Sequence, residues 1–496
     1  MTTHDNPSLP RHLFRAEQVR AMDRFAIETI GIPGYELMCR AGAAALDVLR
    51  QRWPGARTVS VLCGSGNNGG DGYVLARLAR AEGMDVRVYP VADPAHLRGD
   101  ALKAWQDYRQ ADGPVLDFIP EGFEGAEVLV DGLLGTGLDR PVSGVYEQVI
   151  GAINRFAGGV LALDIPSGLH ADTGAILGAA VRAQVTVSFI GLKQGLFTGE
   201  GPDCCGELRF ADLDTPVAVQ HSQKASAELL PCPPLDLPTR SRTAHKGHCG
   251  HVLVVGGDCG FAGAARMAAE AAARVGAGLV SIATRPQHAS VLNLTRPELM
   301  CRGVESAAEL DGLLRSASVV AVGPGLGQSP WARDLFRAVI DSALPLVVDA
   351  DGLNLLAADP RRRDDWVLTP HPGEAGRLLG VASGEVQRDR FAAAASLQER
   401  YGGVLVLKGA GSLVRGGDDV PRICRLGNPG MASGGMGDVL TGVIAGLIAQ
   451  GVSVQTAAEM GVVAHAAAAD LAAAEGGERG LLASDLFPHL RRLVNP

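Results

Sequence analysis

The sequence contains little lysine, few charges and no long apolar run, and each shortage excludes a class of protein. Lysine occurs only five times in 496 residues and the formal net charge is −9, which excludes the overall basic footprint of a nucleic-acid-binding protein. No run of about 20 uncharged apolar residues is present, and residues 1–18 lack the apolar core of a secretory signal. We therefore expect a cytoplasmic protein with neither nucleic-acid nor membrane partners.

The cysteines indicate neither a zinc site nor a set of disulfides. The nine cysteines show no paired zinc spacing, and Cys204 and Cys205 are adjacent, which predicts reduced thiols in a cytosolic protein. A composition of 47% hydrophobic and 20% charged residues with 65 glycines is typical of α/β enzymes. Four prolines in residues 231–238 exclude a helix or a central strand there. The sequence therefore predicts two α/β domains, residues 1–218 and 241–496, joined by a linker over 219–240.

The most informative segment is NPGMASGGMGD, residues 428–438, which runs directly into an apolar helix. Its glycines allow close approach of a ligand, and the free N–H groups and dipole at the start of the helix favour an anion. Asp438 falls in the first turn of that helix. We expect this carboxylate to take a proton from a hydroxyl while the N–H groups of about residues 434–437 bind a phosphoryl group. The motif G-x-x-x-x-G-K-[ST] is absent, which excludes a P-loop kinase.

A second glycine-rich segment lies in the first half. It follows a predicted strand at Val59–Leu62; we expect a loop over Gly64–Gly72 and a helix over Tyr73–Glu82. The glycine spacing satisfies the dinucleotide fingerprint, but Asp85 opens the next strand and is misplaced for holding a ribose. Extra polar groups at Asn67, Asn68 and Asp71 indicate a ligand or a cation at the sheet edge.

Further oxygen-bearing side chains follow other predicted strands. Asp131, Asp164 and Ser167 come at two strand ends in the first half. The carboxyl ends of parallel strands meet at one crevice, so we expect Asn68 to converge with these three. Such oxygen ligands suit an alkali or alkaline-earth cation, although each Asp could instead only cap a turn.

The second half has the same arrangement of polar residues after predicted strands. Asp349, Asp351 and Asn354 follow one strand and Lys408 follows another. His371 lies between Pro370 and Pro372 ahead of Glu374, where it either binds a ligand or is a turn histidine.

The first half resembles the N-terminal domain of the YjeF family, the NAD(P)HX epimerases. The matching motifs are GNNGGDG at 66–72, VDGLLGTGLDRPVSG at 130–144 and LDIPSGLHADTG at 163–174. The resemblance implies a Rossmann-like three-layer domain that binds the hydrated cofactor through Asn67, Asn68, Gly69, Gly70, Asp71, Gly135, Thr136, Gly137, Leu138, Asp139, Arg140, Pro141 and Asp164. It also implies potassium on Asn68, Asp131 and Ser167. Asp164 is the candidate acid/base and Lys193 the second, unless Lys193 is a solvated lysine at a strand end.

The second half resembles the ribokinase-like superfamily, and within it the ADP-dependent NAD(P)HX dehydratases. The matching motifs are GPGLG at 323–327, TPHPGE at 369–374, LKGAGS at 407–412 and NPGMASGGMGDVLTG at 428–442. The resemblance implies a three-layer ribokinase-like domain in which the hydrated cofactor contacts Ala262, Gly325, His371 and Asp438. The adenine nucleotide is expected to bind Lys408, Gly409, Ala410, Gly411, Ser412 and Gly437. The usual phosphoryl donor of this family is ADP, bound with Mg²⁺, and the sequence does not decide between ADP and ATP.

Together the two resemblances predict a bifunctional enzyme of nicotinamide nucleotide repair, both isomerase and lyase. It would interconvert the R and S epimers of NADHX and NADPHX. It would also dehydrate the S epimer at the expense of ADP, giving AMP and phosphate. Two alternatives stay open: a ribokinase-like kinase of a vitamin-precursor alcohol, and a non-catalytic first domain that serves as an interaction module. We expect a homo-oligomer.

Overall fold

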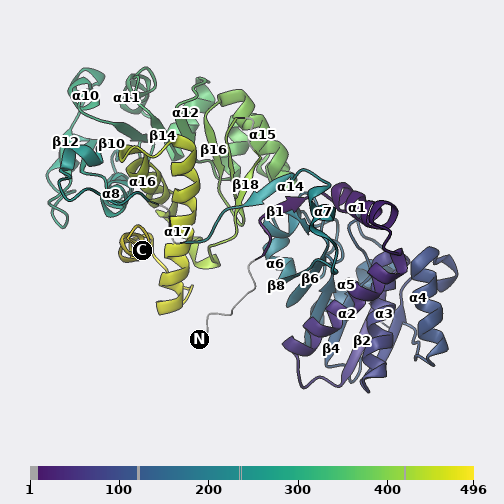
Figure 1. Ribbon diagram of the computed structural model, residues 1–496. Coiled ribbons are helices and arrows are strands. Elements are labelled where there is room, and N and C mark those ends of the chain that lie inside the picture. Colours follow the sequence, from purple (N-terminus) through teal and green to yellow (C-terminus); the bar gives the residue numbers. More distant parts are fainter. Residues whose placement is uncertain (1–8, 120–122, 234, 236, 418–419, 496) are drawn as a thin grey trace. The chain divides into compact units, whose positions relative to one another are not determined.

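The computed structural model describes residues 9–119, 123–233, 235, 237–417 and 420–495. The chain forms two compact units, Met1–Glu228 and Leu229–Pro496 (Figure 1). The segment 219–240, expected to be a linker, contains the end of α7 (Val217–His221) and the strand β9 (Ala227–Leu229). Within the described ranges no helix is long and apolar enough to cross a membrane. All nine cysteines are free thiols.

The N-terminal unit is built on a six-stranded, wholly parallel sheet of order β3-β2-β4-β5-β6-β8. From β2 the chain goes to β3 on one side and then to β4 on the other, so a topological switch point lies between β2 and β4. The strands are β2 (Thr58–Cys63), β3 (Asp85–Pro90), β4 (Val128–Gly132), β5 (Gly159–Leu163), β6 (Val185–Phe189) and β8 (Glu207–Ala211).

Helices cover both faces of this sheet. One core packs valines and leucines of the strands against α1, α2, α3 and α4, and a second packs the opposite face against α5. Strand β1 (His12–Phe14) pairs with β7 (Leu192–Lys193) and with β9. The helices are α1 (Ala16–Phe25), α2 (Gly34–Arg52), α3 (Asn67–Ala81), α4 (Gly99–Gln110), α5 (Val145–Arg155) and the short α6 (Gly201–Cys205). The expectation of a three-layer α/β unit is confirmed.

The predicted boundary between the glycine loop and helix α3 is wrong. We expected the loop to reach Gly72, but α3 begins at Asn67. A Cβ atom at Gly69 would collide with the carbonyl oxygen of Gly64, and one at Gly70 would lie 2.6 Å from the methyl carbon of Met38. These glycines therefore serve close packing inside the first turns, and this packing outweighs their low helix propensity.

The C-terminal unit has a sheet of order β12-β11-β10-β13-β14-β15-β16-β17-β18. The strands from β12 to β16 are parallel, and β17 and β18 are antiparallel additions. Its switch point lies between β10 and β13. The strands are β10 (His251–Val255), β11 (Leu279–Thr284), β12 (Met300–Gly303), β13 (Val319–Val322), β14 (Leu346–Val348), β15 (Trp366–Leu368), β16 (Val404–Leu407), β17 (Ser412–Arg415) and β18 (Arg422–Cys424).

This sheet is also enclosed by two helical layers, which confirms the second three-layer unit (Figure 1). Its central strands β13, β14 and β16 are near-continuous valine and leucine runs, as expected for strands buried on both faces. One layer consists of α8 (Ala262–Arg274), α16 (Met436–Ala449), α17 (Val454–Gly476) and α18 (Leu486–Leu493). The other includes α10 (Ala307–Leu314), α11 (Pro330–Ile340), α12 (Ala350–Ala358), α13 (Pro372–Leu379), α14 (Ser383–Arg388) and α15 (Arg390–Tyr401).

Candidate active sites

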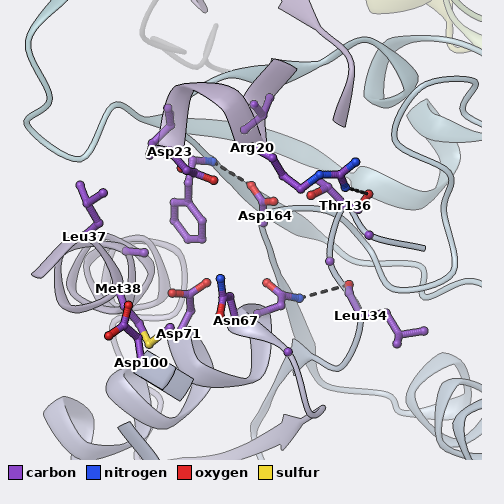
Figure 2. Close-up of a pocket in the computed structure, with 18 of the residues that line it drawn as sticks. Arg20, Asp23, Leu37, Met38, Asn67, Asp71, Asp100, Leu134, Thr136 and Asp164 are labelled. Carbon is purple, nitrogen blue, oxygen red and sulfur yellow. Dashed lines mark hydrogen bonds between the residues drawn. The ribbon is translucent and has the colours of Figure 1, made fainter. Parts of the chain in front are cut away.

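A pocket of about 520 Å³ lies at the carboxyl edge of the N-terminal sheet, at its switch point (Figure 2). Three predicted segments line it: the start of α3 with Asn67, Asn68 and Asp71, the loop from Gly135 to Arg140 after β4, and Asp164 after β5. The structure therefore brings together residues far apart in the sequence. Of the other residues expected to bind the hydrated cofactor, Gly69, Gly70 and Pro141 do not line this pocket.

The three residues predicted to hold a cation share one hydrogen-bond network. Asp131 is fully buried at the end of β4 and accepts hydrogen bonds from Ser167 Oγ (2.6 Å) and Ser167 N (2.8 Å). Asn68 Nδ2 donates to the carbonyl oxygen of Leu134 at 3.2 Å, and Ser167 Oγ lies 3.1 Å from the same oxygen. Burial raises the pKa of Asp131 to about 6 even against its hydrogen bonds.

Asn68 carries the observation that points to an ion. Its side chain is 7% exposed, and its Oδ1 atom is buried without a hydrogen-bond partner among the described residues. A buried polar oxygen left unpaired is costly and calls for an explanation such as a bound ion. The oxygens of Asn68, Asp131 and Ser167 are of the kind that bind alkali cations, so the residues present fit potassium.

Asp164 belongs to a different part of the pocket wall. It follows β5 with φ of 64°, a left-handed conformation that is uncommon for a residue other than glycine. Its Oδ1 accepts hydrogen bonds from the Lys193 ammonium and from Phe189 N, the latter at 3.1 Å. Lys193 is 0% exposed and also donates to Ser188 Oγ at 3.0 Å. The alternative of a solvated Lys193 is therefore wrong, and of the two candidates only Asp164 lines the pocket.

Sequence reasoning missed the contribution of helix α1. Arg20 and Asp23 line the pocket from this helix, and Arg20 Nη1 donates to the carbonyl oxygen of Thr136 at 3.3 Å (Figure 2). Burial, followed by the charge of Asp164, raises the pKa of Asp23 to about 6. Burial and then Asp164 also raise the pKa of Asp71 well above its usual value. No motif surrounds residues 20–23, so the sequence carried no signal for them.

A second cluster of charged residues lies at the carboxyl edge of the C-terminal sheet. Lys408 Nζ, after β16, is 2.6 Å from Asp349 Oδ1, after β14, and 3.8 Å from Glu374 Oε2 in α13. Thr441 in α16 donates to Asp349 Oδ2 at 2.9 Å. Burial raises and the Lys408 ammonium lowers the pKa of Asp349, and the net value lies below the usual one. The predicted strand-end residues Asp349 and Lys408 thus form one buried ion pair.

Asp438 lies beside this ion pair, in the first turn of α16. The helix begins at Met436, after Gly435 with φ of 93°. A Cβ atom on Gly437 would lie 3.1 Å from Lys408 Nζ and 3.2 Å from Asp349 Oδ2, so the helix start approaches the charged groups closely. Burial, and then the neighbouring Asp349, raise the pKa of Asp438 to about 7. The N–H groups of the first helical turn have no partner within the helix.

His371 caps helix α13, as expected if it is a turn histidine. Its Nδ1 accepts a hydrogen bond from Gly373 N at 3.0 Å, and Glu374 Oε2 accepts one from His371 N at 2.8 Å, so the two residues cap α13 reciprocally. The side chain is 55% exposed, and its Nε2 is 3.4 Å from Glu374 Oε1. Burial of the ring, then the Lys408 charge, lower the pKa of His371, which favours a neutral imidazole.

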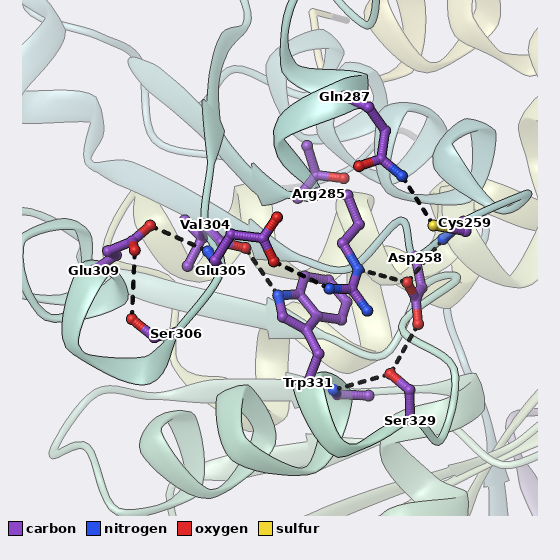
Figure 3. Close-up of polar contacts among 12 residues, drawn as sticks. Asp258, Cys259, Arg285, Gln287, Val304, Glu305, Ser306, Glu309, Ser329 and Trp331 are labelled. Atoms are coloured by element: carbon purple, nitrogen blue, oxygen red, sulfur yellow. Dashed lines mark hydrogen bonds and ion pairs between the residues drawn. The ribbon is translucent and has the colours of Figure 1, made fainter.

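The other wall of this site is formed by the two loops at the switch point. The loop after β10 leads through Phe261 into α8 at Ala262, and Asp258 N donates to Gly325 O at 2.6 Å. Asp258 is held in turn by Arg285 Nε at 2.7 Å and by Ser329 Oγ at 2.9 Å (Figure 3). The Arg285 guanidinium lies 4.2 Å from the centroid of the Trp331 ring. The loop that leads to Ala262 therefore lies against Gly325, and the binding of the hydrated cofactor by both stays a prediction; Asp258 and Arg285, which hold this loop, were missed.

The segment predicted to bind adenine nucleotide turns back from β16 to β17. Gly409 has φ of 140°, and Ser412 Oγ donates to the carbonyl oxygen of Gly409 at 3.0 Å. Lys408 and Gly437 lie at the charged cluster, and residues 409–412 form the turn beside it. Gly327 N donates to Asp351 Oδ2 at 2.9 Å and so joins the loop after β13 to the first turn of α12.

Comparison with known proteins gives matches in both units. The family model described as NAD(P)H-hydrate dehydratase matches residues 252–492, and that described as YjeF-related protein N-terminus matches residues 34–195. The bifunctional NAD(P)H-hydrate repair enzyme of Coxiella burnetii is 54% identical over 488 residues, 98% of this chain and 99% of the relative. That of Escherichia coli is 46% identical over 504 residues, 100% of this chain and 97% of the relative.

Solved structures match part of the chain. The ADP/ATP-dependent NAD(P)H-hydrate dehydratase of Bacillus subtilis, co-crystallised with ATP and Mg²⁺, is 30% identical. That match covers 52% of this chain and 93% of the other, with a TM-score of 0.46.

Proposed function

This chain belongs to the family of bifunctional NAD(P)H-hydrate repair enzymes, and we propose how its two sites divide the reaction. The N-terminal unit, assigned to residues 1–218, interconverts the R and S epimers of NADHX and NADPHX. The C-terminal unit, assigned to residues 241–496, dehydrates the S epimer, with 219–240 as the connection. The observation that carries the second assignment is Asp438, half-buried at a helix start beside the Lys408–Asp349 pair.

Dehydration requires the ring hydroxyl to become a good leaving group. Asp438 takes the hydroxyl proton as the oxygen attacks the terminal phosphorus of ADP, and AMP departs with the electrons of the broken P–O bond. The N–H groups near residues 434–437 hold the transferred phosphoryl group. Phosphate then leaves the ring carbon with its bonding electrons, and loss of a proton from the adjacent carbon restores the double bond of NAD(P)H. Ala262, Gly325 and His371 orient the hydrated ring.

The nucleotide is held on the opposite side of this cluster. Residues 409–412 bind its adenosine part, and Lys408 and Gly437 lie toward its phosphates. Within the described ranges no group of three His, Cys, Asp or Glu side chains is placed to hold a metal ion. This agrees with Mg²⁺, which is commonly bound through substrate phosphates, water and one or two carboxylates. Bound there, Mg²⁺ would neutralise phosphate charge.

In the N-terminal unit Asp164 is the catalytic carboxylate. Residues 67–71 and 135–141 bind the hydrated nucleotide around the pocket at the switch point. Potassium is held by Asn68, Asp131 and Ser167; support comes from the buried, unpaired Oδ1 of Asn68. The ion would supply positive charge and tie α3 to the loop after β4. We place the enzyme in the cytoplasm, where free thiols stay reduced, and propose a homo-oligomer.

The test is recovery of NADH absorbance at 340 nm from chemically prepared NADHX, which contains both epimers. The native chain and the Asp438→Ala variant are each assayed in the presence of ADP, in the presence of ATP and without nucleotide. We expect recovery that needs a nucleotide, is greatest with ADP, consumes both epimers and is lost in Asp438→Ala. Recovery without nucleotide would overturn the phosphoryl-transfer mechanism. A folded native chain inactive with every donor would instead favour a kinase of a vitamin-precursor alcohol. Recovery limited to the S epimer would favour a non-catalytic first unit.

A further inference from the structure

Five aspartates line the epimerase pocket, and three of them, Asp23, Asp71 and Asp164, interact electrostatically with one another. Asp164 is paired with the buried Lys193 and also accepts from Phe189 N. Asp23 from α1 and Asp71 from α3 line the same pocket. Neither side chain makes a hydrogen bond or an ion pair with any residue in the part of the chain that the structure describes. Figure 2 shows Asp71 beside Asn67 on one side of the pocket, and Asp23 with Asp164 on the other.

We propose that Asp23 is a catalytic residue of the epimerase site, which gives a proton to the departing hydroxyl of the substrate. The proposal rests on the epimerase function proposed above. Asp23 precedes the segment 34–195 matched by the family model, so that match assigns it no role. Its place in the pocket is set by α1, which Arg20 ties to the loop after β4 through Thr136 O.

The chemistry of the substrate defines the need for this group. The hydrated carbon carries a hydroxyl and is bonded to the ring nitrogen. The nitrogen lone pair forms a C=N bond as the C–O bond breaks, and Asp23 gives its proton to the departing hydroxyl, which leaves as water. A water then adds to the opposite face of the ring cation. The C=N electrons return to nitrogen, and a pocket carboxylate accepts the released proton. The carbon is inverted with no net oxidation, and exchange with solvent returns the proton from that carboxylate to Asp23.

Asp164 is suited to a different part of this reaction. Its Oδ1 accepts hydrogen bonds from the Lys193 ammonium and from a backbone N–H, which hold the side chain in one position. A fixed negative charge stabilises the positive ring that forms when the hydroxyl leaves. Asp71, on the opposite side of the pocket, is placed to accept the proton released by the incoming water.

The charges around Asp23 and its burial suit this side chain to acid–base catalysis. It is influenced by Asp164 after β5, Lys193 on β7 and Arg24 on its own helix, and Asp71 on α3 interacts with it in turn. Burial and Asp164 raise its pKa, and Lys193 and Arg24 lower it, with a resulting value of about 6. Near neutral pH both protonation states are therefore populated, which suits acid–base catalysis.

The experiment measures conversion of R-NADHX by the full chain with ADP, so that each R molecule epimerised is dehydrated and read at 340 nm. The R epimer is obtained by exhausting the S epimer with an Asp164→Ala chain. We expect Asp23→Asn to lower kcat for the R epimer about 100-fold or more, with little change in KM. Its use of S-NADHX should be unchanged. Glu17→Gln, which removes an exposed carboxyl from the same helix, is the control and should match the native chain.

The outcomes separate this inference from the function on which it rests. If the native chain does not consume R-NADHX, the epimerase assignment fails. If it does, and Asp23→Asn stays within about threefold of it, only the role of Asp23 is overturned. Asp23→Glu covers the case in which Asp23→Asn does not fold: it should retain part of the activity with a displaced pH profile. In the native chain, R-epimer conversion should fall above about pH 6 as Asp23 loses its proton. A Glu variant with the native profile would contradict the proposal.

Discussion

At the scale of single residues, the same carboxyl group serves different purposes in different surroundings. Asp349 and Asp164 lie against lysine ammonium groups and act as fixed charges. Asp438 and Asp23 are half-buried without such a partner in hydrogen-bond contact, and burial raises the pKa of Asp438 to about 7 and that of Asp23 to about 6. Pairs of acids whose pKa values are pushed apart by their environment indicate which group holds charge and which moves a proton.

Asp438 makes the dehydratase sensitive to pH. As a base it must be ionised, so we expect kcat/KM for S-NADHX at saturating ADP to rise with pH and level off above about 7. Asp438→Asn should lose about 10²–10⁴-fold in kcat, the range of one acid–base residue. The measurement is a rate profile over roughly pH 5.5 to 8.5, which spans that pKa.

Asp334→Asn, which changes an exposed carboxyl on α11, is the matched control for this profile. It should retain the native rates across the whole range. A native profile that is flat between the two ends would contradict the assignment of Asp438 as the base.

At the scale of elements, both sites are made by loops at the carboxyl ends of parallel strands, and each needs an anchor outside the motifs. In the N-terminal unit α1 provides it, through Arg20 and the Thr136 carbonyl. In the C-terminal unit the anchor is the Asp258–Arg285 pair (Figure 3). It holds the loop between β10 and α8, in which Asp258 N donates to Gly325 O. Loops positioned by a rigid scaffold are the usual place of binding groups.

Removing Arg285 tests that anchor. Arg285→Ala removes the hydrogen-bonded partner of Asp258 and the cation–π contact with Trp331. We therefore expect the free energy of unfolding to fall by about 1–3 kcal/mol. The loop that presents Ala262 should also become less ordered, and KM for S-NADHX should rise about tenfold, with a smaller change in kcat. Denaturant unfolding and steady-state kinetics measure the two effects.

Arg315→Ala provides the comparison. It removes an exposed ion pair between Arg315, just after α10, and Asp311 within that helix. Such pairs contribute little to stability, so both stability and KM should stay native. Equal effects of the two variants would show that the Arg285 contact does not order the loop.

At the scale of the whole molecule, each unit has its own sheet, its own cores and its own ligands. Two ligand-linked stabilities follow, because a ligand that binds only the folded form stabilises the unit to which it binds. Potassium should stabilise the N-terminal unit by up to about 2.7 kcal/mol at about 100 times its Kd, and ADP should act on the C-terminal unit. Scanning calorimetry of the full chain in potassium and in lithium chloride, with and without ADP, separates the two effects.

Asn68→Ala is the control for the potassium effect. It should remove the difference between potassium and lithium while leaving stabilisation by ADP in place. A potassium effect that persists in this variant would contradict the proposed ligand set.

Many of the residues that the structure brings together at the two candidate sites could be predicted from the sequence. Glycine-rich segments after apolar strands predicted where the ligand edges lie, because parallel strands end at one edge of a sheet. The structure brings Asn68, Asp131 and Ser167 into one network, and Lys408 with Gly437 to the start of α16. The resemblance of the two halves to known families supplied the substrate, which no pattern of residue types could have defined.

Only the tertiary structure decided which groups are paired, buried or placed without a partner. Helix α3 starts inside the predicted loop because Gly69 and Gly70 pack against Gly64 and Met38. Lys193 is buried because Asp164 lies beside it, 29 residues earlier in the chain. Asp23 reaches the pocket because α1 packs over it. Each of these facts depends on contacts between distant segments, and the charge state of a carboxyl depends on its surroundings more than on its neighbours in sequence.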